Sequence, residues 1–347
     1  MRPAKSTIAD IARELNITAS TVSRALNNHA GISTSTKHAV QKAAKKLDYQ
    51  HNKVASSLRL GRTRILGVII PSAEINFFGS VVHGIEKIAN ENGYNILLYQ
   101  SNEQFDYEKK AIETFLRLRV EGVLASISKE TTTLAHFRKI TKRGVPLVLF
   151  DRADSKLKVP FVAINDYKGA YNATAHLIEQ GCRRIAHIAG QQYVAIFSER
   201  FRGYIDALRD HSIKIDDSLI EYGDISIQSG IECTQKLLQL KNPPDGIFAV
   251  EDCTALGSIQ ALKAASLKIP EDVAVIGFAN EAFGGYITPS LSTVDQQTKK
   301  MGETAARIFF QMADDSGQQI DQTILLEPVM IFRDSSRKRT VVQSTVS

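Results

Sequence analysis

The N-terminal segment carries apolar residues at helical spacing. Residues at positions i, i+3, i+4 and i+7 form one stripe, which comprises Ile8, Ile11, Ala12 and Leu15. Thr7 and Asp10 form a variant of the capping box, in which each side chain satisfies an N–H at the helix start. Asn16 tolerates the left-handed conformation that ends a helix tightly. The pattern predicts a short helix that begins near Thr7 and ends near Asn16.

Two more helices follow with the same kind of signal. Thr18 is a good N-cap for a second helix, and Ser33 is a good N-cap for a third helix that runs to about Leu47. The inner faces of these helices comprise Val22, Ala25, Leu26, Val40, Ala43, Ala44 and Leu47. The segment therefore predicts a three-helix head that contains a helix-turn-helix.

The outer face of the second predicted helix is small, hydroxylic or cationic. It comprises Ala19, Ser20, Ser23 and Arg24. A helix with such a face fits the DNA major groove, with its N-terminal residues near the base edges. An ordinary helical hairpin would carry similar residues, so these positions alone leave both interpretations open.

From Ile65 onward, short apolar runs alternate with stretches of helical spacing. The runs are 65–70, 95–99, 122–126, 146–150, 161–164, 184–189, 246–250 and 273–278. Near-continuous apolar strands separated by helices predict doubly wound parallel sheets. So many strands suit two sheets better than one, and the division is expected near 161–166, where no helix separates two strand runs.

Ligands of doubly wound folds bind beyond the carboxyl ends of the strands. The residues that directly follow the predicted strands are therefore candidates for a binding site. They include Phe77, Phe78, Ser101, Asn102, Asp151, Arg152, Glu251, Asp252 and Asn280.

The excess positive charge is concentrated at the N-terminus. Residues 1–64 contain twelve Lys or Arg against three Asp or Glu, and the other residues contain 31 against 34. This asymmetry favours a nucleic-acid-binding head on a nearly neutral body, because neutralised phosphates supply most non-specific affinity. Ribosome binding also fits. Membrane binding fits less well, because no amphipathic stripe sets large aromatics opposite the Lys residues.

The motifs of common enzyme classes are absent from the sequence. It contains neither Gly-x-Gly-x-x-Gly after the first strand nor a Gly-x-x-x-x-Gly-Lys-Ser/Thr, and its eight His residues form no ligand-like cluster. We expect no catalysis, no cofactor and no metal. No apolar run is long enough for a membrane span or a signal peptide, and three distant Cys residues fit free thiols, so a cytoplasmic location is expected.

These residues together resemble the lactose/galactose repressor family of bacterial transcription regulators. The matching segments are 7–12, 21–24, 52–58, 65–68, 77–78, 119–124, 200–204, 252–257 and 289–296. The resemblance implies an α/β protein with a helix-turn-helix head, a hinge helix and a two-subdomain core like a periplasmic binding protein. The expected boundaries are 1–49 for the head, 50–62 for the hinge and linker, 63–163 with 295–328 for the N-subdomain, and 164–294 with 329–347 for the C-subdomain.

The resemblance also implies which residues contact operator DNA. They are Thr7, Thr18, Ala19, Ser20, Thr21, Ser23, Arg24 and Asn27 in the head, and Asn52, Val54, Ala55 and Leu58 in the hinge. Leu58 matches the family's leucine that wedges into the central base step. Two heads of a homodimer are expected to read a pseudo-palindrome. The tail at 335–347 is basic and then polar, without the leucine heptads of a tetramer.

The resemblance implies effector-binding positions at Phe77, Phe78, Asp151, Arg200 and Gln296. Arg152 and Asn280 join these candidates because they follow predicted strands and because of their polar or charged side chains. Two positions depart from many sugar-responsive members. Ile225 stands where an aromatic is common, and Ala279 stands where an Asp is common. Arg152 and Asn280 would instead suit an acidic or phosphorylated ligand.

The expected function is ligand-responsive regulation of carbohydrate genes, by repression or activation. The effector is expected to be a sugar, a sugar phosphate or a sugar acid. Two alternatives are a regulator with a non-sugar effector and a ligand-binding protein without a specific DNA target. A transport binding protein fits poorly, because the head is basic and a signal peptide is absent.

Overall fold

The computed structural model describes residues 6–49, 62–314 and 323–338. The chain divides into two compact units, Met1–Thr63 and Arg64–Ser347, which we call the head and the core. The predicted hinge, with Asn52, Val54, Ala55 and Leu58, lies outside the described residues.

The head contains the three predicted helices. They are α1 (Ile8–Leu15), α2 (Ala19–Leu26) and α3 (Thr34–Lys46). The Thr7–Asp10 capping box is present, and Asn16 ends α1 in the left-handed conformation, with φ 52° and ψ 43°. The hydroxyl of Thr18 accepts a hydrogen bond from the Thr21 N–H at 3.1 Å, and Ser33 caps α3 in the same way. The sequence prediction for these caps is confirmed.

The head has a small core made by one stripe from each helix. Its buried members are Ile11, Ala12, Val22, Ala25, Val40, Ala43 and Ala44. They were the apolar positions of the predicted inner faces, so the helical periodicity alone identified this core. The remaining face of α2 is left for solvent or a partner.

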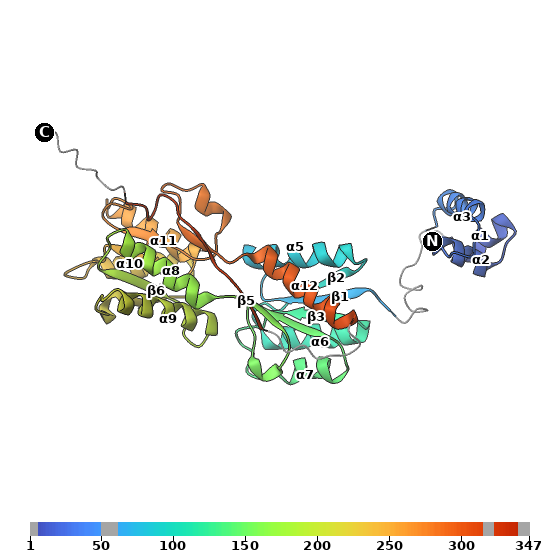
Figure 1. Ribbon diagram of the computed structural model, residues 1–347, viewed down its shortest axis with the longest axis horizontal. Coiled ribbons are helices and arrows are strands. Elements are labelled where there is room, and N and C mark those ends of the chain that lie inside the picture. The colour runs from blue at the N-terminus through green and yellow to red at the C-terminus, as the bar shows by residue number, and fades with distance from the viewer. Residues whose placement is uncertain (1–5, 50–61, 315–322, 339–347) are drawn as a thin grey trace. The chain divides into compact units, whose positions relative to one another are not determined.

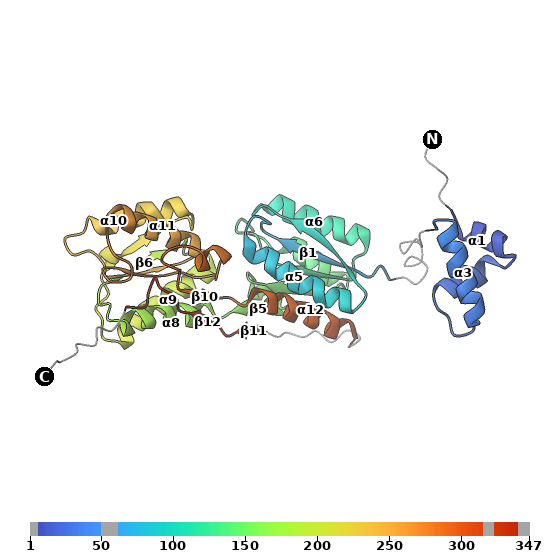
Figure 2. The ribbon, with the colours of Figure 1, turned by 90° about the horizontal axis from the view of Figure 1, so that it is seen from above.

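The first sheet of the core is parallel throughout. Its strands are β1 (Ile65–Ile70), β2 (Asn95–Gln100), β3 (Gly122–Ala125), β4 (Leu147–Phe150), β5 (Phe161–Ile164) and β11 (Thr323–Leu326). They lie in the order β11-β5-β4-β3-β1-β2. The edge strand β11 is contributed by the far C-terminal part of the chain and lies beside β5 (Figure 2).

The second sheet is also parallel, in the order β7-β6-β8-β9. Its strands are β7 (Ile220–Tyr222), β6 (Ile185–Ala189), β8 (Gly246–Ala249) and β9 (Ala274–Ile276). We call each of these two sheets, with the helices that cover it, a layer of the core. An antiparallel pair, β10 (Thr293–Asp295) with β12 (Val329–Ile331), joins the two layers. The apolar runs predicted as strands are strands in the structure, whereas the short strands β7, β10, β11 and β12 were missed.

Helices cover both faces of each sheet (Figures 1 and 2). Those of the first sheet are α5 (Asn76–Glu91) and α12 (Thr298–Asp314) on one face, and α6 (Phe105–Leu118) and α7 (Ala135–Lys142) on the other. Those of the second sheet are α8 (Asp166–Glu179) with α9 (Ala195–Asp210), and α10 (Ile227–Leu238) with α11 (Asp252–Ala264). Three short 3-10 helices are η1 (Ser155–Leu157), η2 (Asp217–Leu219) and η3 (Ala282–Gly285).

Residue alternation along β1 explains why both faces are covered. Leu66, Val68 and Ile70 pack under α5 and α12, and Ile69 packs under α6. Each of these side chains is 0–1 % exposed, so the strand reads as a continuous apolar run. The expectation of doubly wound parallel sheets is confirmed.

The chain crosses between the two layers three times. The crossings follow β5, follow β10 and lie between β11 and β12. The first crossing lies in the predicted 161–166 region. Residues near these crossings therefore sit where the carboxyl ends of both sheets meet.

The start of the C-terminal tail belongs to the core. Ser335 and Ser336 are fully buried. The Ser335 hydroxyl donates to the Val275 carbonyl at 2.7 Å, and Ser336 lies 2.8 Å from Nε2 of the buried His176. These two polar residues at the start of the tail are buried because they supply hydrogen bonds to buried groups.

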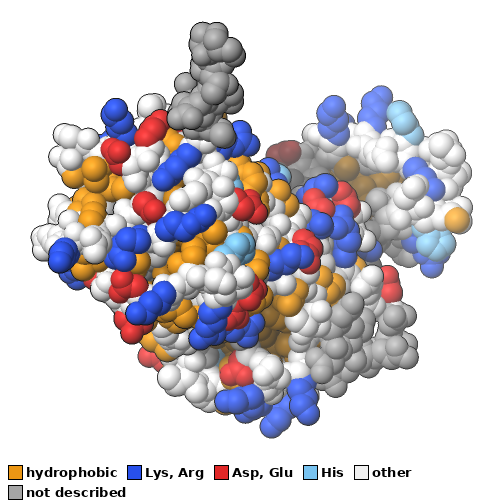
Figure 3. Space-filling model, turned by 60° about the vertical axis from the view of Figure 1, so that its left-hand side comes forward, with side chains coloured by type: hydrophobic (Ala, Val, Ile, Leu, Met, Phe, Trp, Pro, Cys, Tyr) orange, Lys and Arg blue, Asp and Glu red, His pale blue; other side chains and the backbone are white. Residues whose placement is uncertain are grey.

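The surface of the core mixes acidic and basic side chains, with hydrophobic side chains between them on the face shown in Figure 3. Among the described residues, no helix is both long and apolar enough to cross a membrane.

Substitution of Gly84 tests the packing of α5 against α12. A Cβ atom at Gly84 would overlap the backbone carbonyl of Lys299, so Gly84→Ala should destabilise the core by about 1–3 kcal/mol. Gly79 lies in the same helix with open space around it, and Gly79→Ala should stabilise the core by about 0.5–1 kcal/mol. Urea unfolding followed by circular dichroism measures both. Equal effects of the two changes would contradict the close packing.

Candidate functional site

The outer face of α2 carries the residues expected to contact DNA. Thr18, Ala19, Ser20, Arg24 and Asn27 are exposed, and Thr21 and Ser23 are half-buried. Thr7 is exposed too, but its hydroxyl is engaged with Asp10 at the start of α1. The structure therefore brings the predicted base-reading residues onto one surface.

The charge around this surface is positive. Residues Ala19–Leu26 include no acid. The two acids of α1 each carry a cationic partner, with Asp10 at 3.1 Å from Arg13 and Glu14 at 2.6 Å from Lys46. Because those carboxylates are paired, little in the head opposes the approach of a phosphate backbone.

The core contains a cavity of about 310 Å³ at the carboxyl ends of the strands. Six of the seven residues expected to bind an effector line it, namely Phe77, Phe78, Asp151, Arg152, Arg200 and Gln296. We call this cavity the inner chamber. Residues of both layers form it, as expected for a site at the junction of two doubly wound sheets.

Arg200 on α9 is the centre of the inner chamber and is 1 % exposed. Its Nε donates to Asp166 at 2.8 Å, and its Nη1 donates to the Val250 carbonyl at 2.8 Å and to Glu251 at 2.7 Å. Its Nη2 reaches Gln296 at 3.4 Å. The guanidinium lies 3.7 Å from the centre of the Phe278 ring. Most of its donors are thus satisfied by the protein itself.

Carboxyl groups outnumber free cations around Arg200. Burial raises the pKa of Asp166 to about 6 and the pKa of Glu251 to about 7, and the nearby Arg200 offsets part of each rise. Burial also raises the pKa of Asp151. Asp151 and Glu251 line the inner chamber and Asp166 lies behind Arg200, so the chamber is rich in carboxyl groups whose burial favours their protonated form.

Arg152 is already neutralised by protein carboxylates. Its two terminal nitrogens donate to the two oxygens of Glu103 at 2.8 and 2.9 Å, and its Nε lies 3.4 Å from Asp151. A bidentate pair of this kind leaves few donors for an anionic ligand. Arg152 was the main cation expected to bind an acidic or phosphorylated effector, so its pairing with Glu103 argues against an effector of that class.

Asn280 lies apart from the other predicted effector residues. Its side chain donates to Asp295 at 3.3 Å and accepts from Arg333 at 2.9 Å, and it lines a different groove with Asn76 and Lys299. The neighbouring Glu281 does line the inner chamber and accepts a hydrogen bond from Asn76 at 3.2 Å. This bond connects the first layer to the second beside the chamber.

The apolar wall of the inner chamber combines rings and aliphatic side chains. Phe77 and Phe78 line the cavity and are also core residues, 8 % and 2 % exposed. Ile225 lines the opposite wall in the left-handed conformation, with φ 67°. This conformation is costly for a β-branched residue, and such strain is found at functional sites.

A buried carboxylate accepts hydrogen bonds from the loop that carries Lys129. Glu108 is 0 % exposed and accepts from the Ser128 N–H at 2.8 Å and from the Thr131 hydroxyl at 2.6 Å. His136 lies 2.7 Å from the same carboxylate.

Among residues 6–49, 62–314 and 323–338, no group of three or more His, Cys, Asp or Glu side chains is arranged to hold a metal ion.

Comparison with known proteins decides the family. Residues 7–52 match the family described as bacterial regulatory proteins, lacI family, and residues 174–336 match the periplasmic binding protein-like domain. The chain is 32% identical to the catabolite control protein A of Priestia megaterium, over 95% of this chain and 99% of that protein.

The chain belongs to the lacI family. It is also 27% identical to the transcriptional repressor PurR of Mannheimia succiniciproducens, over 96% of this chain and 99% of that protein. A solved structure of the transcriptional regulator CelR in complex with cellobiose superimposes with a TM-score of 0.71, at 27% identity, over 95% of this chain and 100% of that chain. This lacI-family protein is a DNA-binding regulator and is not an enzyme, in agreement with its relatives.

Sequence reasoning missed several residues of the inner chamber in this lacI-family protein. Glu281, Ile196 and Phe197 line it, and Asp166 positions Arg200. Asp166 lies two residues beyond β5, so the strand-end rule that pointed to Asp151 could also have found it. Glu281 directly follows the candidate Asn280, so the same rule could have found it too. Ile196 and Phe197 follow a longer loop after β6, and the sequence offered no comparable signal for them.

The titration of Asp166 can be tested through stability. Its pKa is about 6 in the folded protein and about 3.9 in an unfolded chain, so its contribution to stability is present at low pH and is lost as the pH rises through 6. The unfolding free energy of the wild type minus that of Asp166→Asn should fall by about 1–2 kcal/mol between pH 4.5 and 7.5. Urea unfolding of the core, followed by circular dichroism, measures this difference. An increase with pH would show that Arg200 lowers the pKa instead.

Proposed function

We propose that this protein is a ligand-responsive repressor that binds a pseudo-palindromic operator as a homodimer. The observation that carries the proposal is the position of Arg200. It joins Asp166 and Gln296, which lie beside two of the three crossings between the layers, inside a cavity lined with effector positions. A ligand that binds there changes the arrangement of the two layers, and so it can shift a conformational equilibrium.

The two layers correspond to the two subdomains that the family resemblance implies. We assign 63–163 with 295–328 to the N-subdomain and 164–294 with 329–347 to the C-subdomain. The sheet membership of β11 and the pairing of β12 with β10 support these boundaries. Residues 1–49 form the DNA-reading head, and 50–62 connect it to the core.

The DNA contacts are assigned to the outer face of α2. Ala19 and Ser20 are small, so direct base readout at these positions is limited. Arg24 provides a long side chain whose guanidinium can donate hydrogen bonds to bases or phosphates. Thr18, Thr21, Ser23 and Asn27 supply hydrogen bonds to phosphates or bases, and Thr7 lies at the start of α1. A regulator that binds chromosomal DNA works in the cytoplasm, beside the nucleoid.

The effector is assigned as an uncharged, hydroxyl-rich molecule such as a sugar. Glu251, Glu281 and Asp151 offer acceptors for hydroxyl donors, while Arg152 and Arg200 are held by protein carboxylates. A phosphate or carboxylate on the ligand would face these acids without a free cation. Carbohydrate genes are therefore the proposed targets.

A selection of genomic fragments tests the proposed function. The purified protein is incubated with sheared genomic DNA, with and without a panel of sugars, sugar phosphates and sugar acids, and the retained fragments are sequenced. We expect a shared pseudo-palindrome near carbohydrate genes, whose recovery changes with an uncharged ligand. Retention of DNA without any sequence preference under all conditions would contradict the proposal.

Two matched variants identify the DNA-reading surface. Arg24→Ala should weaken operator binding by about tenfold or more, because it removes a donor from the recognition helix. Lys42→Ala removes the same charge from the exposed side of α3 and should weaken operator and non-specific DNA binding alike. The ratio of specific to non-specific affinity, measured by fluorescence anisotropy at fixed salt, distinguishes the two.

The homodimer can be tested at the free edge of the first sheet. β2 is an edge strand, and its Leu98 is 43 % exposed. An exposed apolar edge is a surface that a second copy can cover. Leu98→Arg should shift the protein from dimer to monomer in sedimentation velocity and reduce operator affinity. A monomeric wild type, or a dimer that the change leaves intact, would show that this edge is not the interface.

A further inference from the structure

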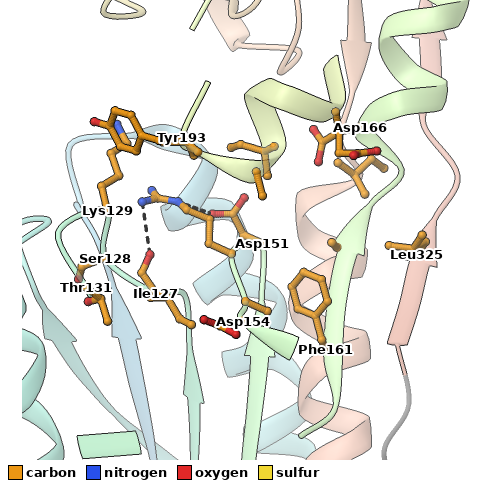
Figure 4. A pocket seen from close by; sticks show the side chains of 18 of the residues that line it. Ile127, Ser128, Lys129, Thr131, Asp151, Asp154, Phe161, Asp166, Tyr193 and Leu325 are labelled. Atoms are coloured by element: carbon orange, nitrogen blue, oxygen red, sulfur yellow. Dashed lines mark hydrogen bonds and ion pairs between the residues drawn. The ribbon is translucent and has the colours of Figure 1, made fainter. Parts of the chain in front are cut away.

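A second cavity of about 420 Å³ adjoins the inner chamber. Four residues line both cavities, namely Lys129, Asp151, Arg152 and Ile196. The two cavities therefore share part of their walls. We call the second cavity the outer chamber (Figure 4).

The outer chamber lies against the crossing segments of the core. Phe161 comes from β5, Leu325 comes from β11, and Asp166 begins α8. Figure 4 shows Asp151 between Tyr193 and Lys129 on one side and Phe161 and Leu325 on the other. A ligand here contacts both layers and two of the strands that connect them.

The walls of the outer chamber combine apolar surfaces with acceptors. Phe161 is half-buried, and Tyr193 and Leu325 are 74 % and 52 % exposed. Asp154 and Glu199 line the same space and offer carboxylate oxygens. The chamber thus has ring faces for an apolar surface and acceptors for hydroxyl groups.

Carboxyl groups outnumber cations around the outer chamber, since Asp151, Asp154, Asp166 and Glu199 line it together with Lys129 and Arg152. Arg152 forms its bidentate pair with Glu103, and Lys129 lies 3.9 Å from the same carboxylate. The chamber therefore disfavours anions, as the inner chamber does. Both chambers select the same chemistry, which is a ring with hydroxyl donors on its edge and C–H groups on its face.

We infer that the outer chamber is a second sugar subsite and that the effector is a two-ring glycoside of the disaccharide class. One ring occupies the inner chamber, the other lies between Phe161 and Tyr193, and the glycosidic bond passes beside Ile196 and the Asp151–Arg152 pair. Each chamber has the volume of a small-molecule site, so a single sugar ring fills one and leaves the other to water. This inference rests on the proposed function, since it takes the inner chamber as the effector site.

The second ring has a role beyond added affinity. It contacts β5, β11 and the start of α8, which lie beside crossings between the two layers. A disaccharide can therefore bias the arrangement of the layers more strongly than either of its component sugars.

Calorimetric titration of the full-length protein tests the inference. The probes are cellobiose, lactose, maltose, sucrose and trehalose, each compared with its component monosaccharides. At least one disaccharide should bind tenfold or more tightly than each of its components. If no disaccharide on this panel reaches that ratio, the inference is wrong.

Two variants locate the second ring. Tyr193→Ala removes one wall of the outer chamber, and Ala195→Trp fills the chamber from the exposed start of α9. Both should abolish the tenfold advantage of the disaccharide and leave the affinity for its tighter-binding component within twofold of the wild type. Tyr286→Ala is the matched control, because Tyr286 is 89 % exposed and lines neither chamber. An advantage that survives both chamber variants would overturn the assignment.

Operator binding measured with the same ligands separates the two proposals. A monosaccharide that alone controls operator binding would support the proposed function and refute the second subsite. A disaccharide that binds with the expected advantage but leaves operator binding unchanged would support the subsite and contradict ligand-responsive regulation.

Discussion

The arrangement of the core depends on one buried guanidinium. Arg200 is almost completely enclosed, so its charge requires acceptors from the protein, and these acceptors come from distant parts of the chain. Asp166 and Gln296 lie beside crossings between the layers, and Glu251 lies at the end of β8. The same contacts that satisfy the charge hold the two layers in register around the cavity. A ligand that binds beside Arg200 therefore acts where the layers are joined.

The polar site is possible because the sheets around it are rigid and apolar. Parallel strands covered on both faces leave only their carboxyl ends for polar chemistry, and the loops there carry the carboxylates and arginines of both chambers. Strain is stored at the same place, since Asp151 and Ile225 both have positive φ angles. The resulting surface is rich in acceptors and has few unpaired cations. This charge balance favours neutral, hydroxyl-rich ligands over anions.

Prediction from the sequence succeeded wherever the determining interactions are local. The caps at Thr7, Thr18 and Ser33 and the inner faces of the head helices follow from residues a few positions apart. The long apolar strands were equally evident. The three- and four-residue strands β7, β10, β11 and β12 were missed, because such short runs carry no clear period and form only through distant partners. Asn280 was grouped with the effector residues, but its hydrogen bonds to Asp295 and Arg333 hold it in another groove.

The sequence by itself therefore determined the helical head, its basic charge, the alternating core and the family to which the chain belongs. These properties depend on composition and on spacing within short segments. Only the tertiary structure decided which charges face each other. Arg152 and Glu103 are 49 residues apart, and their pairing removes the cation that an anionic ligand would need. The outer chamber likewise exists only because β5, β11 and the start of α9 converge, and a cavity between distant segments leaves no periodic signal in the sequence.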